Sequence, residues 1–196
     1  MIFHLGSGYH LWPHGFTERD GFGDYTERNV RVDARRGVPV SEIGSGPSPI
    51  YPTTPEEIER CRTPDEVGDV ATLDWVVERW GRPDKIAAED VLEHIPRVRA
   101  VVALSNWVRV LQPGGILHVR VPDVDALARA YVAGELPFAR LILQVEGSQD
   151  YPENTHLSQW SLTTVTEALE KLGLSVRGEV REPWNAWVWG EKPCAS

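Results

Sequence analysis

The stretch Lys-Ile-Ala-Ala-Glu-Asp-Val-Leu-Glu-His-Ile-Pro, residues 85–96, decides the fold that we predict for this chain. Its first four residues form a short run that predicts a buried strand, and acidic residues follow directly. Pro96 then opens a helix, which the Gly114-Gly115 pair ends before the apolar strand 116–121. A strand, a crossover helix and a second strand in this order predict a parallel pair within an α/β sheet.

The same alternation continues on both sides of this unit. Short apolar runs predict further strands at residues 2–5, 29–33, 67–70, 174–179 and 186–189, and helices at 73–80, 127–132, 138–145 and 162–172. The last two strands are close enough in sequence to pair antiparallel. We therefore predict an α/β fold, a doubly wound, mostly parallel, seven-stranded Rossmann-like sheet with helices on both faces and an antiparallel last strand.

The helix that Pro96 opens carries apolar residues at helical spacing, which is typical of a face that packs on a core. We expect this stripe to pack against the sheet, and its members are Val98, Val101, Val102, the small Ser105, Val108 and Leu111.

Ligands of such sheets bind beyond the carboxyl ends of the strands, so the residues that follow each strand form the candidate site. The turn Gly6-Ser7-Gly8 follows the first strand, where glycines let the backbone approach a ligand and offer N–H groups to it. Asp33 ends the second strand, where a carboxylate can accept hydrogen bonds from both hydroxyls of a ribose. A tight turn without ligand and an exposed aspartate explain the same residues.

Two acidic residues follow the buried strand at 85–88. Glu89 and Asp90 could hold the ammonium group of an amino acid, because carboxylates attract such a cation. The alternative is a helix N-terminus that is rich in acidic residues because they complement the helix dipole.

Three segments together resemble class I S-adenosylmethionine-dependent methyltransferases, and in particular the methyltransferase type 11 group. They are Val91–Ile95 (VLEHI), Trp107–Gly115 (WVRVLQPGG) and Leu117–Asp123 (LHVRVPD). That group combines Leu-Glu-His after the fourth strand with a Pro-Gly-Gly turn into the fifth, and the combination is specific although neither part is. His156 and the Trp160-Ser161 pair resemble the closing segment of the group.

The resemblance implies an enzyme that transfers a methyl group from its cofactor, S-adenosyl-L-methionine, to an unidentified small-molecule or protein acceptor. By the resemblance, Asp33 holds the ribose, Asp69 accepts a hydrogen bond from the adenine amino group, and Glu89 and Asp90 lie beneath the methionine end. The implied cofactor-binding residues are Leu5, Gly6, Ser7, Gly8, Asp33, Ala34, Gly68, Asp69, Val70, Glu89 and Asp90.

A base is needed where the acceptor must lose a proton, and His94 and His156 are the candidate catalytic residues. Each could instead have a structural role at a helix start or in a loop. Leu11 stands where a dinucleotide fingerprint has its third glycine, and the chain lacks Tyr-x-x-x-Lys. Both features argue against an NAD-dependent oxidoreductase, and a non-catalytic methyltransferase-fold scaffold or subunit is the second alternative.

Composition sets the remaining expectations. The 196 residues suit a single methyltransferase domain, 1–196, with a surface insertion around 44–64. The formal charge of -9 argues against nucleic acid as a partner. Two cysteines make no disulfide framework and no structural zinc site, and we predict no metal. We expect a cytoplasmic protein without signal peptide or membrane span, and we leave a homo-oligomer open.

Overall fold

The computed structural model describes residues 1–5, 29–33, 66–149, 154–181 and 184–194. Its elements are β1 (Ile2–Leu5), β2 (Asn29–Asp33), β3 (Glu66–Val67), α2 (Asp74–Trp80), β4 (Lys85–Glu89), the 3₁₀ turn η3 (Leu92–His94), α3 (Arg97–Val110), β5 (Ile116–Pro122), α4 (Val124–Val132), α5 (Phe138–Glu146), α6 (Leu162–Lys171), β6 (Ser175–Arg181) and β7 (Asn185–Glu191). The expected glycine turn at 6–8 and the expected insertion at 44–64 lie outside the described residues.

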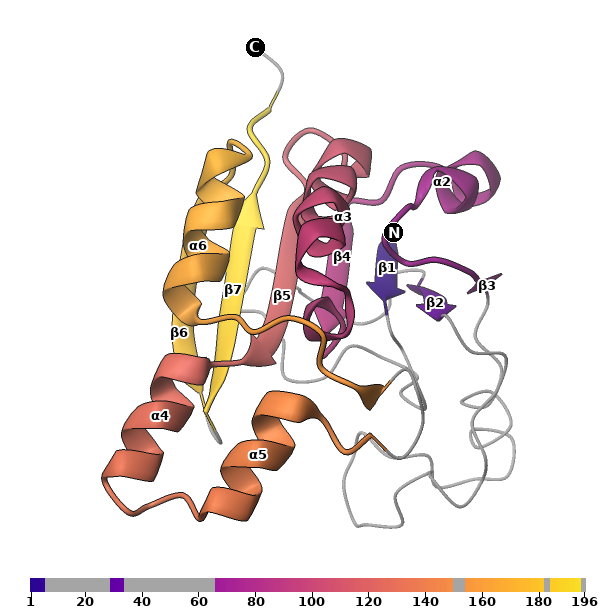
Figure 1. Cartoon of the computed structure of the whole chain (residues 1–196). Coiled ribbons are helices and arrows are strands. Elements are labelled where there is room, and N and C mark those ends of the chain that lie inside the picture. The colour runs from indigo at the N-terminus through magenta and orange to yellow at the C-terminus, as the bar shows by residue number, and fades with distance from the viewer. Residues whose placement is uncertain (6–28, 34–65, 150–153, 182–183, 195–196) are drawn as a thin grey trace, which may run out of the picture.

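The strands form one sheet in the order β3-β2-β1-β4-β5-β7-β6 (Figure 1). Neighbouring strands from β3 to β5 pair in parallel, whereas β7 pairs antiparallel with both β5 and β6. The predicted mostly parallel α/β sheet with an antiparallel last strand is therefore confirmed. The order reverses between β1 and β4, because the chain adds β2 and β3 on one side of β1 and the later strands on the other.

Three helices, α2, α3 and α6, cover the same face of the sheet, in front of the strands in Figure 1. The neighbours α2 and α3 are joined by a two-pronged ion pair between Arg109 and Asp74, with N–O distances of 2.7 and 2.8 Å. The links from β1 to β2 and from β2 to β3 fall largely in residues that are not described. We predicted helices on both faces of the sheet, and the described residues test this prediction for the face that α2, α3 and α6 cover.

The core lies between the sheet and these helices. Residues that alternate along the strands, such as Phe3, Ile86 and Leu117, are completely buried against α3 and α6. Their neighbours in sequence, Ile2 and Ala87, point to the other face and are buried as well. Burial on both faces is the pattern of a parallel sheet, and it explains why these strands read as continuous apolar runs.

The stripe predicted to bury α3 is wrong for its first half. Val98, Val101 and Val102 are 84%, 53% and 56% exposed and Ser105 is exposed as well, whereas Val108 and Leu111 are buried as predicted. The buried stripe shares Val108 and Leu111 with the predicted one, and its other members are Ala100, Ala103, Leu104 and Trp107.

Trp107 decides which stripe faces inward, because its large ring is completely buried and its indole N–H finds a partner there. Nε1 donates a hydrogen bond of 2.7 Å to the carbonyl oxygen of Val70, in the loop after β3. The alanines beside Trp107 let the helix approach the strands closely, which packing at crystal-like density favours.

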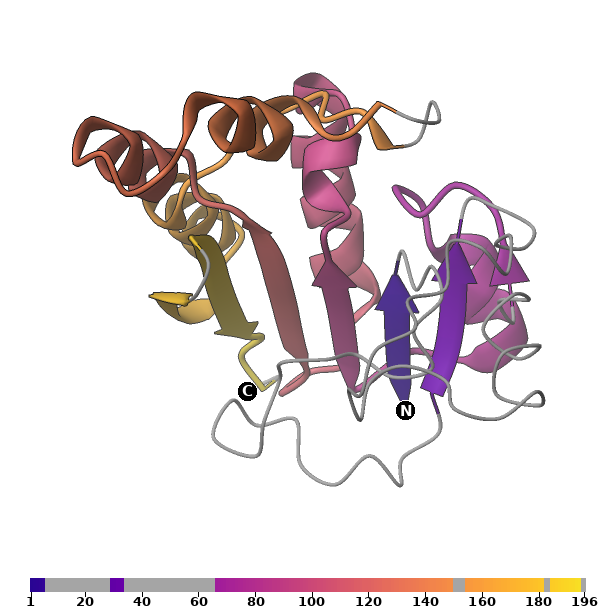
Figure 2. The same ribbon diagram turned by 90° about the horizontal axis from the view of Figure 1, so that it is seen from below.

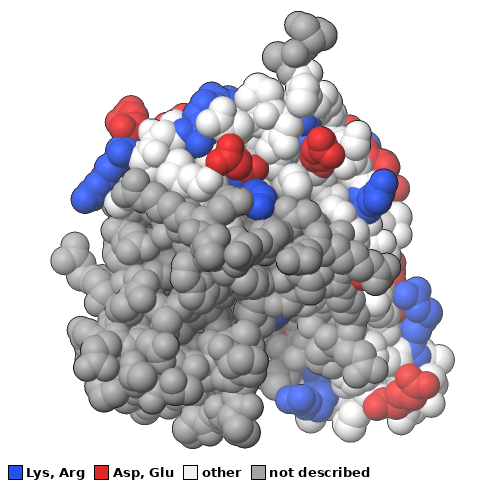
Figure 3. All heavy atoms as spheres, turned by 180° about the vertical axis from the view of Figure 1, so that it is seen from behind, with Lys and Arg blue, Asp and Glu red and all other residues white. Residues whose placement is uncertain are grey.

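The helices α4 and α5 lie beyond the carboxyl ends of the parallel strands, at the lower edge of the sheet in Figure 1 and the upper edge in Figure 2. No described helix is long and apolar enough to cross a lipid bilayer. On the face seen in Figure 3, basic and acidic side chains of the described residues are intermixed rather than separated by sign.

Asp123 joins β5 to two helices at this edge, and its side chain is almost completely buried. Oδ1 accepts a hydrogen bond of 2.8 Å from the amide of Ala126 in the first turn of α4. Oδ2 accepts one of 2.9 Å from the amide of Leu162, the first residue of α6. One carboxylate therefore accepts hydrogen bonds from the first turns of two helices, whose N–H groups have no acceptor within the helix.

We expect Asp123→Ala to lower the free energy of unfolding by about 2–4 kcal/mol, because two helix starts lose their acceptor at a buried position. Urea denaturation measures this loss. Asp125→Ala is the matched control, since that aspartate is exposed in the first turn of the same helix. Equal stability of the two variants would contradict the double-capping role.

Candidate active site

The candidate site lies where β1, β2 and β4 end. Leu5 at the end of β1 is in register with Val32 on one side and Ala88 on the other. Asp33 and Glu89 each come one residue later, so they flank the end of β1 at the same edge of the sheet. This edge coincides with the reversal of strand order, the place where open α/β sheets bind ligands.

A buried charge cluster occupies the β4 side of this edge. The guanidinium of Arg120 binds the carboxylate of Asp90 with two nitrogens, and Nε donates over 2.9 Å. The buried carboxylate of Glu89 lies 3.8 Å from the same guanidinium. Burial acts to lower the pKa of Arg120, but attraction to Asp90, Glu89 and Glu93 raises it overall. Two carboxylates share one cation, so these three residues together carry one negative charge.

Asp90 adopts a left-handed backbone conformation, with φ of +51°. Aspartate tolerates this region better than most residues, yet such backbones concentrate at functional sites. The amide of Asp90 donates to the carbonyl oxygen of Arg120 over 3.0 Å. Side chain and main chain of these residues thus hold one another at the end of β4.

The turn η3 is tied to a segment far away in sequence, residues 154–160. The carbonyl oxygen of Glu93 accepts hydrogen bonds from the amides of Leu157 and Ser158, at 2.7 and 3.0 Å. The hydroxyl of Ser158 donates to the carbonyl oxygen of Leu92 over 3.1 Å. This docking places His156 beside His94, with ring centroids 4.8 Å apart in an edge-to-face arrangement.

Both imidazole rings are oriented by backbone carbonyls. Nδ1 of His94 lies 3.2 Å from the carbonyl oxygen of Thr155, and Nδ1 of His156 lies 3.0 Å from that of Gln144. A carbonyl only accepts, so each Nδ1 is the donor and the lone pair of a neutral ring is on Nε2. Burial, and then the neighbouring His94, lower the pKa of His156, which keeps its ring neutral near pH 7.

Glu93 completes this group. Its side chain is 2% exposed, and neither carboxylate oxygen has a hydrogen-bond partner on another described residue. Burial raises the pKa of Glu93 well above 4.5, and repulsion from Asp90 adds to the shift. One ligand atom each from Glu93, His94 and His156 lies within 4.8 Å of the others, so the three side chains could hold a metal ion. Glu93 and His156 also line a small pocket with Gln144.

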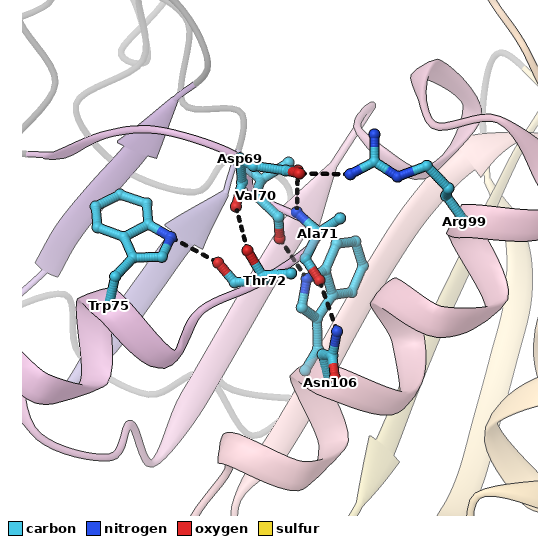
Figure 4. Close-up of polar contacts among 8 residues, drawn as sticks. Asp69, Val70, Ala71, Thr72, Trp75, Arg99 and Asn106 are labelled. Atoms are coloured by element: carbon cyan, nitrogen blue, oxygen red, sulfur yellow. Dashed lines mark hydrogen bonds and ion pairs between the residues drawn. The ribbon is translucent and has the colours of Figure 1, made fainter.

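The loop after β3 forms the other flank of the site and is shown in Figure 4. Asp69 accepts a hydrogen bond of 3.0 Å from the amide of Ala71 and forms an ion pair with Arg99 of α3. The carbonyl oxygen of Ala71 accepts from the side-chain amide of Asn106 over 3.0 Å. Together with the bond from Trp107, these contacts fasten the loop to α3.

Comparison with solved structures identifies the fold. A SAM-dependent methyltransferase from Archaeoglobus fulgidus superposes with a TM-score of 0.57 at 13% identity, covering 97% of this chain and 85% of the other. An O-methyltransferase family protein from Burkholderia thailandensis gives 0.56 at 13% identity, over 100% and 51%. Human N-acetylserotonin methyltransferase, solved in complex with SAM, gives 0.56 at 13% identity, over 98% and 47%.

The chain has the fold of SAM-dependent methyltransferases. It spans about half the length of the last two of these proteins, 51% and 47%. No family model matches the sequence, and no curated protein matches it either. The resemblance to the type 11 group in particular therefore stays a prediction.

Within this methyltransferase fold, the predicted site residues fall into three groups. Leu5, Glu89 and Asp90 lie where the strand order reverses, and β2 ends at the same edge with Asp33. Gly68, Asp69 and Val70 form the flanking loop, where the carboxylate of Asp69 is already engaged with Arg99. The remaining predicted residues, Gly6, Ser7, Gly8 and Ala34, lie outside the part of the chain that the structure describes.

The structure brings the two predicted bases, His94 and His156, together. Two residues of the site were not among those predicted from the sequence: Glu93, which lies beside the histidines, and Arg120, which lies between Glu89 and Asp90. The signal for Glu93 was present, because it lies within the Leu-Glu-His motif next to a predicted base. Arg120 lies within the segment Leu117–Asp123, but its role depends on the register that sets it opposite Glu89.

We expect Glu93→Gln to gain stability relative to the native chain as pH rises from 4 to 8, in buffer with a chelator. A raised pKa in the folded state means that folding binds a proton, so the native chain loses this contribution as pH rises above 4.5. Urea denaturation across this range measures the difference.

The matched control is Glu146→Gln, which makes the same chemical change at an exposed position of α5. Its stability difference from the native chain should stay flat over the same pH range. The lowered pKa of His156 makes the folded state less stable on acidification. Because His156 is present in all three proteins, this effect cancels in the comparison. A pH-independent difference for Glu93→Gln would contradict the burial argument.

Proposed function

We propose that this chain is a SAM-dependent methyltransferase that binds its cofactor across the carboxyl ends of β1, β2 and β4. The observation that carries the proposal is the sheet order, which reverses between β1 and β4 and sets acidic residues at the reversal. The solved methyltransferases with the same fold support this assignment.

The residues at the reversal fit the charge of the cofactor. S-adenosylmethionine carries an ammonium and a sulfonium group, and the cluster of Glu89, Asp90 and Arg120 carries one negative charge in a buried setting. Asp33 ends the strand next to β1, the position from which a carboxylate reaches ribose hydroxyls. The loop with Asp69 and Val70 then lies on the adenine side.

The cofactor supplies an electrophilic methyl group. What the protein contributes is alignment of the acceptor, removal of a proton where the acceptor carries one, and exclusion of water. His94 and His156 suit the second task, because Nδ1 of each ring is held by a carbonyl and the lone pair is on Nε2. The lowered pKa of His156 keeps this ring in the form that accepts a proton.

The acceptor that we propose is a small molecule or a protein side chain. The net charge of -9 argues against a nucleic-acid acceptor.

The first test is cofactor binding. We expect titration calorimetry to show that the chain binds S-adenosylmethionine and S-adenosylhomocysteine, and that Asp33→Ala weakens binding about tenfold, the equivalent of one charge-assisted hydrogen-bond pair. Asp84→Ala is the control, because Asp84 lies at the opposite end of the sheet, where it pairs with the N-terminal amine. Equal affinity of the two variants would remove Asp33 from the site.

The second test is turnover. His94→Ala and His156→Ala are each expected to lower methyl transfer about a hundredfold or more, which is the range of general base catalysis, while cofactor affinity stays within about twofold. Acceptor screening by release of S-adenosylhomocysteine supplies the assay. Full turnover by both variants would exclude the two imidazoles as bases.

A non-catalytic scaffold with the same fold is separated by the same two measurements. Cofactor binding without turnover on any acceptor would favour the scaffold, and absence of cofactor binding would contradict our proposal altogether.

A further inference from the structure

We propose that Glu93, His94 and His156 form a binding site for one divalent transition-metal ion. The three side chains come from two segments, the turn η3 and residues 154–160, which backbone hydrogen bonds hold against each other. One ligand atom from each lies within 4.8 Å of the other two. The inference goes beyond the proposed methyl transfer and does not depend on it.

The buried carboxylate is the first argument. Glu93 is 2% exposed, and its oxygens have no hydrogen-bond partner on another described residue. Arg120, the basic residue that acts on it, is already bound to Asp90 by two nitrogens. A buried carboxylate without partners is costly, and a cation beside it removes that cost.

The orientation of the imidazoles is the second argument. In metal sites the ligating histidine donates its other ring N–H to a carbonyl or carboxylate, which fixes the ring and directs the lone pair at the metal. Both rings have this arrangement, since Nδ1 of His94 faces the carbonyl of Thr155 and Nδ1 of His156 faces that of Gln144. The two rings are also neighbours, with centroids 4.8 Å apart in an edge-to-face contact.

The separations fit an ion after a small adjustment. Ligand atoms about 2.1 Å from one tetrahedral ion are about 3.4 Å apart, so side-chain movements of about 1 Å close the group from 4.8 Å. His156 and Glu93 also line a small pocket, which is about the size that one water molecule needs.

The ligand types select the class of ion. Two imidazoles and one carboxylate suit Zn²⁺, Fe²⁺, Co²⁺ or Mn²⁺, and three protein ligands with open positions are typical of catalytic rather than structural sites. Within the described residues the site contains no thiolate, because the cysteine described there, Cys194, lies near Gly114 at the other end of the sheet. Mg²⁺ and Ca²⁺ are disfavoured, because they prefer oxygen ligands throughout.

The metal site offers a second explanation for lost turnover in the histidine variants, because a lone pair that binds an ion cannot accept a proton. Activity alone therefore does not separate a base from a ligand. Direct measurement of ion binding does, and it gives the same answer whether or not the chain binds S-adenosylmethionine.

The experiment is calorimetric titration of the chelator-treated full chain with Zn²⁺, and with Co²⁺ followed by absorption spectroscopy. We expect one ion per chain with a micromolar or lower dissociation constant. Glu93→Gln and His156→Gln should each weaken binding at least about tenfold, since even outer-shell changes cost 10–100-fold. The control Glu146→Gln should bind as the native chain does.

Circular dichroism and thermal unfolding establish that each variant is folded. His156 is only partly buried, so His156→Gln decides the question if Glu93→Gln does not fold. Absence of Zn²⁺ and Co²⁺ binding by the native chain would overturn the proposal. Binding that His156→Gln leaves unchanged would overturn it as well, since the ion would then lie elsewhere.

Discussion

The arrangement of the site depends on one backbone carbonyl, that of Glu93. It accepts the amides of Leu157 and Ser158 and so fastens the segment 154–160 to the turn after β4. Neighbouring contacts reinforce this junction, because Trp160 donates its indole N–H to the Ser158 hydroxyl over 2.8 Å and Arg97 lies over the Trp160 ring. Without the junction, the two histidines would belong to unrelated loops.

Charge is distributed unevenly around this junction. Arg120 is shared by Glu89 and Asp90 and stacks on Trp187 at 5.2 Å, so these two acids are partly compensated and one negative charge is left at the end of β4. Glu93 lies beyond the hydrogen bonds of that arginine, and its side chain is almost completely buried. The same edge of the sheet thus contains two acids that share an arginine and a third that no described basic residue binds directly, and this difference is why we propose distinct roles for them.

Much of the fold could be predicted, because each strand of a parallel sheet is a short apolar run bounded by glycine, proline or acidic residues. The strands at Ile2–Leu5 and Lys85–Glu89 were both recognisable in this way. The inward face of α3 was not, because two apolar stripes share the same spacing and only the fit of Trp107 against the Val70 carbonyl distinguishes them. Periodicity measures polarity along one helix and contains no information about the surface it meets.

The sequence by itself determined that the chain alternates strands with helices, and that acidic residues follow strands at a ligand-binding edge. It also supplied both histidines and the motif that contains Glu93. Only the tertiary structure decided that His156 meets His94, that Arg120 pairs with two acids and that Glu93 has no such pairing. The reason is physical: local patterns report burial and backbone preference, whereas the pairing of charges depends on strand register and loop docking, which bring together residues that are remote in sequence.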